Sequence, residues 1–393
     1  MTIRRVRYII FLRDVLILSV TAFGGPQAHL AMVLDMMVKK RGYIGEKELV
    51  ELYALCQILP GPTSTQTITS LGFRLGGPGL AYLTLFVWMF PAFCIMTFLA
   101  ITVNFMQEMN ISLDFLRIIQ PMTVGVVAYS AYRISSSVIS SRIGYFLMIL
   151  SAFISYFLKN PFVFPFIIIA GGCITAFRFK DQPIEEKSRI RINWTSFIIW
   201  VTVIFSAAIL WRITGWFPFR LFDNFYRNGS MIFGGGQVLV PLLFTEFVEF
   251  KKYLTSQEFI SGYALVQAIP GPVFSFSAYV GALSMREWGI GGQILGGFVA
   301  AVGIFLPGTL FIFFVIRFWE SLKKYRVVKA SLEGINAVSS GMVMAATFLL
   351  FETIEPTFIN YLLMIGTAST IFFTKIPTPL IILGGLVLGI VLY

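Results

Sequence analysis

Five consecutive hydrogen-bonding side chains follow a Pro-Gly-Pro turn in an otherwise apolar stretch of the chain. The run Thr63-Ser64-Thr65-Gln66-Thr67 begins directly after Pro62. A proline suits the first turn of a helix, where its missing N–H would be unpaired anyway. The backbone N–H groups of such a helix start are free and carry roughly half a positive charge. Neutral hydroxyls and an amide around that start are therefore predicted to hold an anion and to release it again.

A second Pro-Gly-Pro turn repeats this arrangement 210 residues later. The segment Gln57-Ile58-Leu59-Pro60-Gly61-Pro62 recurs as Gln267-Ala268-Ile269-Pro270-Gly271-Pro272 (267 − 57 = 210). An upstream motif, Phe23-Gly24-Gly25-Pro26-Gln27, recurs at the same offset as Phe233-Gly234-Gly235-Gly236-Gln237 (233 − 23 = 210). Helix breakers in duplicated apolar segments are typical of the binding sites of secondary transporters.

The candidate substrate-binding residues lie at or beside these four breaks. They are Gly24, Gly25, Gln27, Gln57, Gly61, Thr63, Ser64, Thr65, Gln66, Gly235, Gln237, Gln267, Gly271, Ser275 and Ser277. The predicted structural helix breaks are Pro26, Pro60, Pro62, Pro270 and Pro272. For the hydroxyl residues, the alternative is that they merely cap the half-helices. The four glutamines either satisfy freed carbonyls or donate to substrate, and the sequence does not decide between these roles.

His29 is the single histidine and lies close to the first break. Histidine titrates near physiological pH, so this residue is a candidate for carrying a coupling proton. The alternative is an ordinary hydrogen-bonded helix residue, and its counterpart Leu239 cannot carry a proton. Carboxylates are scarce within the apolar segments, which argues against a carboxylate-based cation pump. The pattern Thr255-x-x-Glu258 predicts a capping box rather than a functional acid.

The composition is that of an all-α polytopic membrane protein. Hydrophobic residues make up 57% of the chain and charged residues 12%, whereas soluble domains carry about 25% charged residues. Three stretches come near or exceed the roughly 20 apolar residues that span a bilayer. They are residues 79–102, 194–210 and 289–316.

The net charge of +11 is distributed as expected for a membrane protein. Basic residues cluster in short loops between apolar runs, following the positive-inside tendency, so nucleic acid is not an expected partner. The three cysteines, Cys56, Cys94 and Cys173, lack metal-ligand spacing and read as packing thiols. Neither a metal nor a cofactor is predicted. A membrane-embedded enzyme would usually need a base, nucleophile or metal cluster that this sequence does not suggest.

The chain divides into two repeats joined by a linker. The predicted units are residues 1–178, a polar linker with a bridging transmembrane helix at 179–214, and residues 215–393. The interrupted segments are 15–38, 49–75, 230–250 and 257–285. Uninterrupted helices are predicted near 79–104, 114–133, 143–158, 161–178, 194–212, 290–316, 331–351, 357–373 and 377–393. Pro91 and Pro307 differ by 216, so about six inserted residues are expected between the second Pro-Gly-Pro turn and the next helix.

Loop charges predict that the two repeats are inverted. Residues 101–113 contain no Lys or Arg, whereas the equivalent 317–329 contains Arg317, Lys323, Lys324, Arg326 and Lys329. The next loop shows the reverse bias, and equivalent loops of opposite bias belong on opposite sides of the membrane. The basic clusters 39–41 and 251–252 do not follow this pattern. The N-terminus is expected to be retained and to lie in the cytoplasm.

The first-copy motifs resemble the signature of the chromate ion transporter (CHR) family. The resemblance rests on residues 23–29, Arg41 and residues 54–66, and it extends over essentially the whole chain. It implies a long-chain member with fused halves that exports chromate across the inner membrane; some relatives are thought to carry sulfate-like anions. Tyr43 stands where tryptophan is expected, and Gly236 replaces a proline.

Carried over by position, the motif residues are Gly24, Gly25, Pro26, His29, Gln57, Pro60, Gly61, Pro62, Ser64, Gln66, Gly271 and Pro272. The predicted function is secondary transport of chromate or a similar tetrahedral divalent oxyanion by alternating access. The alternatives are a sulfate or small organic anion transporter or exchanger, and an anion channel. Expected partners are the oxyanion and membrane lipids; oligomeric state is open, with a homodimer as one arrangement.

Overall fold

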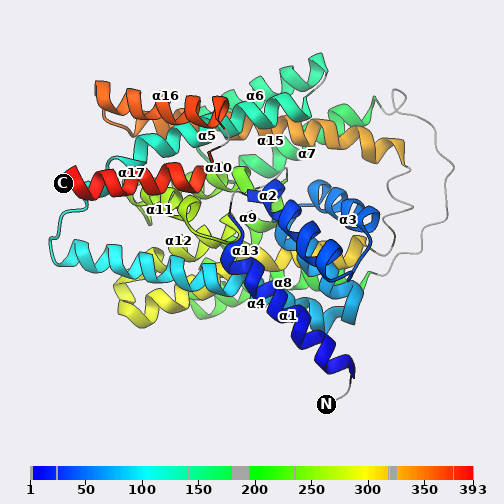
Figure 1. The fold of residues 1–393 in the computed structure, drawn as a ribbon. Coiled ribbons are helices and arrows are strands. Elements are labelled where there is room, and N and C mark those ends of the chain that lie inside the picture. Colours follow the sequence, from blue (N-terminus) through cyan, green and yellow to red (C-terminus); the bar gives the residue numbers. More distant parts are fainter. Residues whose placement is uncertain are drawn as a thin grey trace. The chain divides into compact units, whose positions relative to one another are not determined.

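The computed structural model describes residues 3–23, 25–139, 141–178, 194–233, 236–316, 318, 325–374 and 376–392. Within these ranges the chain is helical and contains no β-strand (Figure 1). It forms two compact units, and each unit takes segments from both repeats. Unit 1 comprises Met1–Ser112, Trp194–Ser230 and Leu265–Phe314, and unit 2 comprises Leu113–Asn193, Met231–Ala264 and Val315–Tyr393.

Unit 1 contains the Pro-Gly-Pro turns of both repeats. Its elements are α1 (Ile3–Thr21), α2 (Gly25–Val33), the π-helix η1 (Leu34–Lys40), α3 (Glu46–Ile58), α4 (Thr63–Glu108), α8 (Thr195–Thr214), α9 (Phe217–Met231), η6 (Val273–Ser275), α12 (Phe276–Ser284), η7 (Arg286–Trp288) and α13 (Gly289–Val315).

Unit 2 contains the remaining helices of both repeats. Its elements are η2 (Asp114–Leu116), α5 (Ile119–Val138), α6 (Arg142–Leu158), α7 (Val163–Ala176), η4 (Gly236–Val238), α10 (Leu239–Leu243), the π-helix η5 (Phe244–Phe250), most of α11 (Ser256–Ala268), α15 (Arg326–Glu352), α16 (Phe358–Phe373) and α17 (Thr378–Leu392).

The duplication is visible in the local backbone conformation. The π-helices η1 and η5 begin 210 residues apart (244 − 34), and α3 and α11 begin and end 210 residues apart (256 − 46 and 268 − 58). π-Helices are rare and often mark functional segments. Two of them at one offset show that the repeats share backbone structure as well as motifs.

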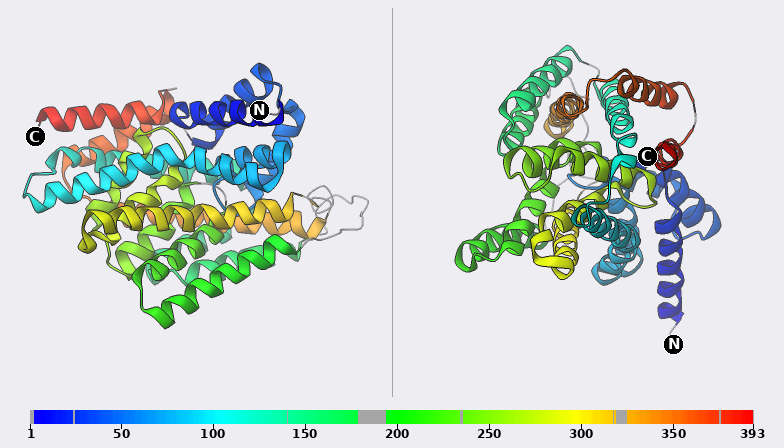
Figure 2. Two further views of the ribbon diagram at one scale, coloured as in Figure 1. Left: turned by 90° about the horizontal axis from the view of Figure 1, so that it is seen from below. Right: turned by 90° about the vertical axis from the view of Figure 1, so that its left-hand side faces the viewer.

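Each Pro-Gly-Pro turn is followed by a helical hairpin. In the first hairpin (Thr63–Glu108), α4 contains Gly77 with φ 74° and ψ −166°, so two helices meet at a kink. In the second hairpin (Val273–Val315), Gly289 has φ 67° and ψ −167° between α12 and α13. Glycine tolerates this positive φ without a steric penalty. The long arms run in opposite directions in Figure 2, where α4 is blue to cyan and α13 yellow to gold.

The predicted insertion is divided between two places. The kink glycines Gly77 and Gly289 differ by 212 (289 − 77), so two of the six extra residues precede the kink. The other four lie between the kink and Pro307, inside α13. Four residues are about one helical turn, which preserves the face that the helix presents. The expectation that the whole insertion precedes the next helix was therefore wrong.

Helices of unit 2 pack reciprocally between the repeats. α15 packs against α6, and its equivalent α5 packs against α16. A side chain on Gly341 would overlap the carbonyl oxygen of Met148, and one on Gly125 would overlap that of Met364. Both pairs have the same offset of 216 (341 − 125 and 364 − 148). Equivalent glycines thus allow equivalent close helix contacts, as membrane helices favour.

α8 lies where the bridging helix was predicted, and a further helix follows that the sequence did not predict. α9 is equivalent to residues 7–21 of α1, which is most of that helix (217 − 210 = 7 and 231 − 210 = 21). Arg220, Asp223 and Arg227 lower its hydropathy, which hid it from a search for apolar segments. The second repeat therefore begins with a helix that corresponds to α1.

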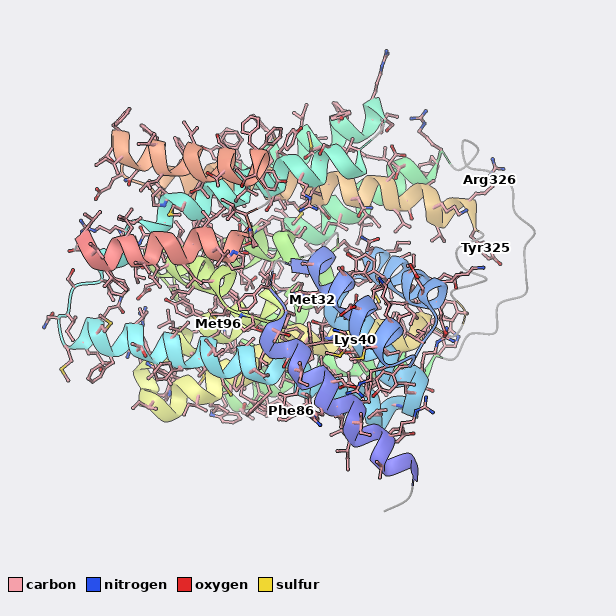
Figure 3. All side chains as sticks on the ribbon, viewed as in Figure 1. Met32, Lys40, Phe86, Met96, Tyr325 and Arg326 are labelled. Atoms are coloured by element: carbon pink, nitrogen blue, oxygen red, sulfur yellow. The ribbon has the colours of Figure 1, made fainter. Side chains whose placement is uncertain are left out.

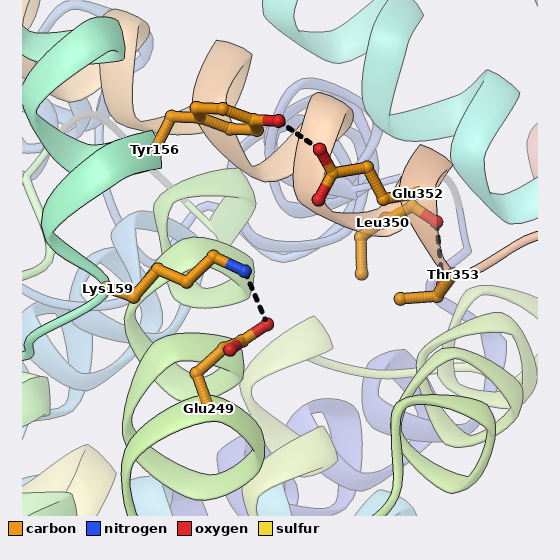
Figure 4. A network of polar contacts seen from close by, with 6 residues as sticks. All are labelled: Tyr156, Lys159, Glu249, Leu350, Glu352 and Thr353. Atoms are coloured by element: carbon orange, nitrogen blue, oxygen red, sulfur yellow. Dashed lines mark hydrogen bonds and ion pairs between the residues drawn. The ribbon is translucent and has the colours of Figure 1, made fainter.

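Unit 2 holds polar contacts at the end of α6 and around η5 (Figure 4). Lys159 forms an ion pair with Glu249 at 3.3 Å, and Tyr156 donates a hydrogen bond to Glu352. The Thr353 hydroxyl donates to the Leu350 carbonyl at 2.7 Å.

The predicted capping box is confirmed, because Thr255 N–H donates to Glu258 at 2.8 Å and Glu258 N–H donates to the Thr255 hydroxyl at 3.2 Å.

The surface confirms a polytopic membrane protein. Helices long and apolar enough to cross a bilayer are Thr63–Glu108, Thr195–Thr214, Arg286–Val315 and Arg326–Glu352. Large apolar side chains are exposed along these and shorter helices, and such patches are incompatible with water. On α4, for example, Phe86 is exposed while Met96 is buried; both are labelled in Figure 3.

Candidate functional site

Both Pro-Gly-Pro turns lie in unit 1, and in each the glycine has a positive φ and lies close to a neighbouring helix. Gly61 has φ 120° and Gly271 has φ 105°, values that L side chains rarely adopt. A Cβ on Gly61 would lie 2.9 Å from the Cα of Gly308, and one on Gly271 would lie 2.9 Å from the Cβ of Ala92. Ala92 and Gly308 follow equivalent prolines (308 − 92 = 216). Each turn therefore contacts the long arm of the other repeat's hairpin.

The helices that start at these turns have no side-chain cap. Pro62 precedes α4 and Pro272 precedes η6, and neither start receives a side-chain cap hydrogen bond. Pro62 and Thr63 are buried. The first N–H groups of both helices are therefore left for water or a ligand. Both N-cap residues are prolines, which have no side-chain acceptor, and the role of the adjacent hydroxyls stays a prediction.

Gln66 fastens the first turn. Its side chain is buried, and Nε2 donates to the Pro60 carbonyl at 2.8 Å and to the Gly308 carbonyl at 2.9 Å. Among the described residues, Oε1 receives no hydrogen bond. The amide hydrogens of this predicted substrate ligand are thus used inside the protein, where they tie the first turn to α13.

Thr65 and Trp88 of the first hairpin lie next to His29 of α2. The Trp88 indole N–H donates to the Thr65 hydroxyl at 3.1 Å. The His29 ring meets Trp88 edge-on, with 5.6 Å between ring centroids. His29 is 1% exposed. The geometry therefore brings the predicted coupling residue close to a predicted substrate-binding hydroxyl.

A backbone hydrogen bond joins the first and second breaks. The Gly271 N–H donates to the Ala22 carbonyl at 2.8 Å. Neither ring nitrogen of the buried His29 makes a hydrogen bond with the described residues. The second turn is therefore held against the end of α1, directly before the first Gly-Gly-Pro motif.

The hydroxyls of the two repeats differ in how they are satisfied. In the first, Thr67 donates to the Thr63 carbonyl at 2.8 Å and Ser70 donates to the Gln66 carbonyl at 2.7 Å. In the second, Ser275 and Ser277 are fully buried, and their hydroxyls have no partner among the described residues. Buried hydroxyls without a protein partner favour bound water or a ligand.

The other predicted site residues show no such contacts with one another. Gln57 is exposed and Ser64 and Gln267 are half-buried. Gly25, Pro26 and Gln27 form the first turn of α2, and Gln237 lies in η4. Gly24 and Gly235 lie outside the described residues, as do the side chains of Gln27 and Gln237. Their roles stay predictions.

A buried charge cluster was missed as a site by sequence reasoning. Asp14 is 0% exposed, and Arg41 donates to it at 2.8 Å while the Tyr43 hydroxyl donates at 2.9 Å. Burial and then the bond to Asp14 raise the pKa of Tyr43 to about 12, so it remains a donor at neutral pH. A carboxylate inside an apolar segment, followed by a motif arginine, was the available signal.

The described residues contain no cluster of three or more His, Cys, Asp or Glu side chains placed to hold a metal ion. Cys56 is buried, whereas Cys94 and Cys173 are exposed on apolar helices. The polar groups of the site are hydroxyls, amides and backbone N–H groups. Such neutral donors bind anions through many modest hydrogen bonds.

These features define a polytopic helical membrane protein built from a duplicated broken-helix repeat. Comparison with known proteins identifies the particular group: the chain belongs to the chromate transporter family, whose profile matches residues 10–176 and 219–390. The suspected resemblance is thereby confirmed, and it covers both repeats.

The relatives are named as transporters. The chain is 27% identical over 378 residues to an uncharacterized transporter of Methanocaldococcus jannaschii, covering 95% of this chain and 91% of the relative. It is 24% identical to a probable chromate transport protein of Synechococcus elongatus, covering 96% and 93%. It is 23% identical to a chromate transport protein of Cupriavidus metallidurans, covering 96% and 91%. No solved structure matches the chain.

Proposed function

We propose that this protein is a secondary transporter that carries chromate or a similar tetrahedral divalent oxyanion out of the cell. The observation that carries the proposal is the pair of buried, uncapped helix starts behind Pro62 and Pro272 within one unit. Uncapped helix starts bind anions through free N–H groups and the helix dipole. The family membership and the names of the relatives support chromate as the substrate.

The two repeats are proposed to be inverted and to rock against each other around the anion. Three observations support inversion. The long arms α4 and α13 run in opposite directions, equivalent glycines contact equivalent residues of the other repeat, and equivalent loops carry opposite charge bias. An inverted repeat offers two structurally similar ways to close the pathway, one toward each side of the membrane.

The proposed topology places the protein in the cytoplasmic membrane with its N-terminus in the cytoplasm. The sequence repeats are residues 1–178 and 215–393, joined by the linker and bridging helix at 179–214. Exposed apolar side chains on the described helices would contact lipid. A homodimer is proposed as the assembly, and crosslinking in native membranes would test it.

The membrane potential can drive export without ATP. A divalent anion leaving a cell that is negative inside is favoured by about 4.6 kcal/mol per 100 mV (2 × 2.3). Proton exchange through His29 is the alternative coupling mode. Transport by His29→Gln would lose its pH dependence under that mode, and an unchanged pH profile would exclude it.

The decisive experiment is uptake into proteoliposomes. Labelled chromate and sulfate are supplied with and without a membrane potential, and with and without a pH gradient. We expect saturable chromate uptake that responds to the potential. Preference for sulfate or an organic dianion would identify the substrate alternatives, and ionic currents far above carrier turnover would identify a channel.

The binding site is tested by removing hydroxyls from both helix starts. Thr65→Val combined with Ser275→Val keeps side-chain volume close to the original and removes one donor from each repeat. We expect transport to fall while expression and membrane insertion are unchanged. Wild-type transport by the double variant would remove the proposed site.

A further inference from the structure

Three polar groups, two in the second hairpin and one on the facing long arm of α4, make no hydrogen bond with the described residues. They are the Ser275 hydroxyl at the start of α12, the Thr97 hydroxyl on α4 and Oε1 of Gln293 on α13. Their residues are 0%, 5% and 1% exposed. Buried polar atoms at membrane depth persist where they face protein partners, water or a ligand. Three such atoms in and beside one hairpin therefore indicate more than a packing defect.

Contacts between α12 and α13 place the three groups at successive levels. The Phe274 ring lies 6.0 Å from the Phe305 ring, next to Ser275. A Cβ on Gly297 would lie 2.7 Å from the Thr97 hydroxyl and 3.2 Å from the Ala278 carbonyl. The Thr97 hydroxyl thus points at the contact between the two helices.

Gln293 lies nearest the turn of the hairpin. A Cβ on Gly292, its neighbour in sequence, would lie 2.9 Å from the Met285 carbonyl. Ten residues separate Ser275 from Met285, which corresponds to about 15 Å of helix. This is about half of the roughly 30 Å hydrocarbon core, so the row reaches from the broken helix toward one membrane face.

The end of the row has the character of a membrane–water interface. The candidate membrane span that includes α13 begins at Arg286. Trp288 is 53% exposed there, and tryptophan is enriched at membrane interfaces. A basic residue beside an interfacial tryptophan suits the entrance or exit of a pathway for anions.

Two of the three equivalent positions are apolar, and at the third, Thr65, the hydroxyl accepts a hydrogen bond from Trp88. The counterpart of Thr97 is Phe313 (313 − 97 = 216), which stacks on Phe73 at 4.8 Å and meets Tyr82 edge-on at 5.4 Å. The counterpart of Gln293 at the kink offset is Ala81 (293 − 81 = 212), which is fully buried. Beside the first hairpin α13 therefore contributes an aromatic ring to a stack, where α4 contributes a hydroxyl beside the second hairpin.

We propose that Ser275, Thr97 and Gln293 line a hydrated route for small oxyanions between the second break and the membrane face where α13 begins. In this conformation the aromatic stack of Phe73, Tyr82 and Phe313 closes the equivalent route along the first hairpin. The inference rests on the proposed function, because it takes the second break as one end of the anion's path.

Cysteine accessibility tests the route without measuring transport. The native cysteines are replaced by alanine, and single cysteines are introduced by Thr97→Cys and Gln293→Cys. A membrane-impermeant, negatively charged thiosulfonate is then added to vesicles of both orientations. We expect modification about tenfold or more faster than in the matched variants Phe313→Cys and Ala81→Cys, because thiol reactivity requires access to water. Chromate or sulfate should slow the reaction.

Trp288→Cys is the positive control, since this exposed position reports that the reagent reaches the surface. Failure of Thr97→Cys and Gln293→Cys to react while Trp288→Cys reacts would overturn the route. Equal reaction of Phe313→Cys would overturn the closure of the first hairpin. Labelling proceeds whatever anion is carried, so absence of chromate uptake with intact labelling would count against the proposed substrate and not against the route.

Substitutions that keep the fold test the same residues in transport. Thr97→Val and Gln293→Leu should each lower anion transport about tenfold, the effect of losing one neutral hydrogen bond. Thr97→Ser keeps the hydroxyl and should retain transport. Equal activity of the valine and serine variants would show that the hydroxyl is not used.

Discussion

The two hairpins share a backbone design but use their side chains differently. Both start at a glycine with positive φ, turn at a second glycine and lie against the other repeat. In the first hairpin, the side chains of Gln66 and Thr67 donate hydrogen bonds to backbone carbonyls. In the second, Ser275 and Ser277 leave their hydroxyls without described partners. Duplication has preserved the geometry of the break, while one copy fastens the structure and the other offers free donors.

The charges around the breaks differ in the same sense. The first repeat buries Asp14 with Arg41, whereas the counterpart of Asp14 is the buried Asn224 (224 − 14 = 210). His29 is likewise replaced by Leu239. At these positions of unit 1 the charged and titratable side chains therefore belong to the first repeat. The second repeat has a buried ion pair of its own in unit 2, where Lys251 contacts Glu246 at 3.0 Å.

Removing the amide that fastens the first turn should have the largest effect. Gln66→Leu leaves the carbonyls of Pro60 and Gly308 without their donor, at a cost of about 1–3 kcal/mol for each. We expect a large loss of thermal stability in detergent, which is measured by monitoring unfolding with fluorescence or light scattering. The counterpart is Phe276 (276 − 66 = 210), so Phe276→Leu is the matched control. Equal destabilisation by both changes would contradict the fastening role.

Replacing each turn glycine by alanine should have a different effect on stability, because the two glycines pack against different atoms. Gly61→Ala brings a Cβ onto the Gly308 backbone, which cannot move aside, and should destabilise by about 3 kcal/mol. Gly271→Ala meets the Ala92 side chain and should cost about 1–3 kcal/mol of backbone strain. Adding Ala92→Gly should partly restore Gly271→Ala and leave Gly61→Ala unchanged. Rescue of both, or of neither, would show that these contacts are not decisive.

Neutralising Asp14 tests whether the first repeat needs its fixed charges. Asp14→Asn weakens two charge-assisted hydrogen bonds, but Arg41 can regain water because 42% of its side chain is exposed. We expect a loss of about 1–2 kcal/mol in unfolding free energy. The converse change, Asn224→Asp, places a carboxylate in the second repeat and should slow anion transport. Unaltered transport there would indicate that the second repeat tolerates negative charge.

The smallest effect is expected where a hydroxyl is already satisfied. Thr67→Val removes a hydrogen bond to a carbonyl one turn earlier, and such bonds contribute little to helix stability. Transport should stay within about twofold of the wild type. Ser277→Ala, at the counterpart position (277 − 67 = 210), should lower transport by about tenfold. The reverse order of effects would assign the substrate contacts to the first repeat.

Apolar length and helix breakers predicted most helices and both Pro-Gly-Pro turns. The predicted helix 143–158 corresponds to α6 at Arg142–Leu158, because its apolar run is uninterrupted. α9 was missed because charges along one face lower its hydropathy. The Gln66 contact with Gly308 spans 242 residues, and no local pattern reports a partner so distant. Sequence therefore located the candidate donors, while their partners depended on packing between repeats.

The reciprocal packing of unit 2 has a consequence for biogenesis. α6 and α7 are complete at Ala176, but α15, against which both pack, begins at Arg326, 150 residues later (326 − 176). At about 5–20 residues per second, the ribosome needs roughly 8–30 s to supply it. During that interval the small-residue faces of α6 and α7 remain open to lipid or to quality-control factors. Synthesis speed across the middle of the chain should therefore influence the yield of folded protein.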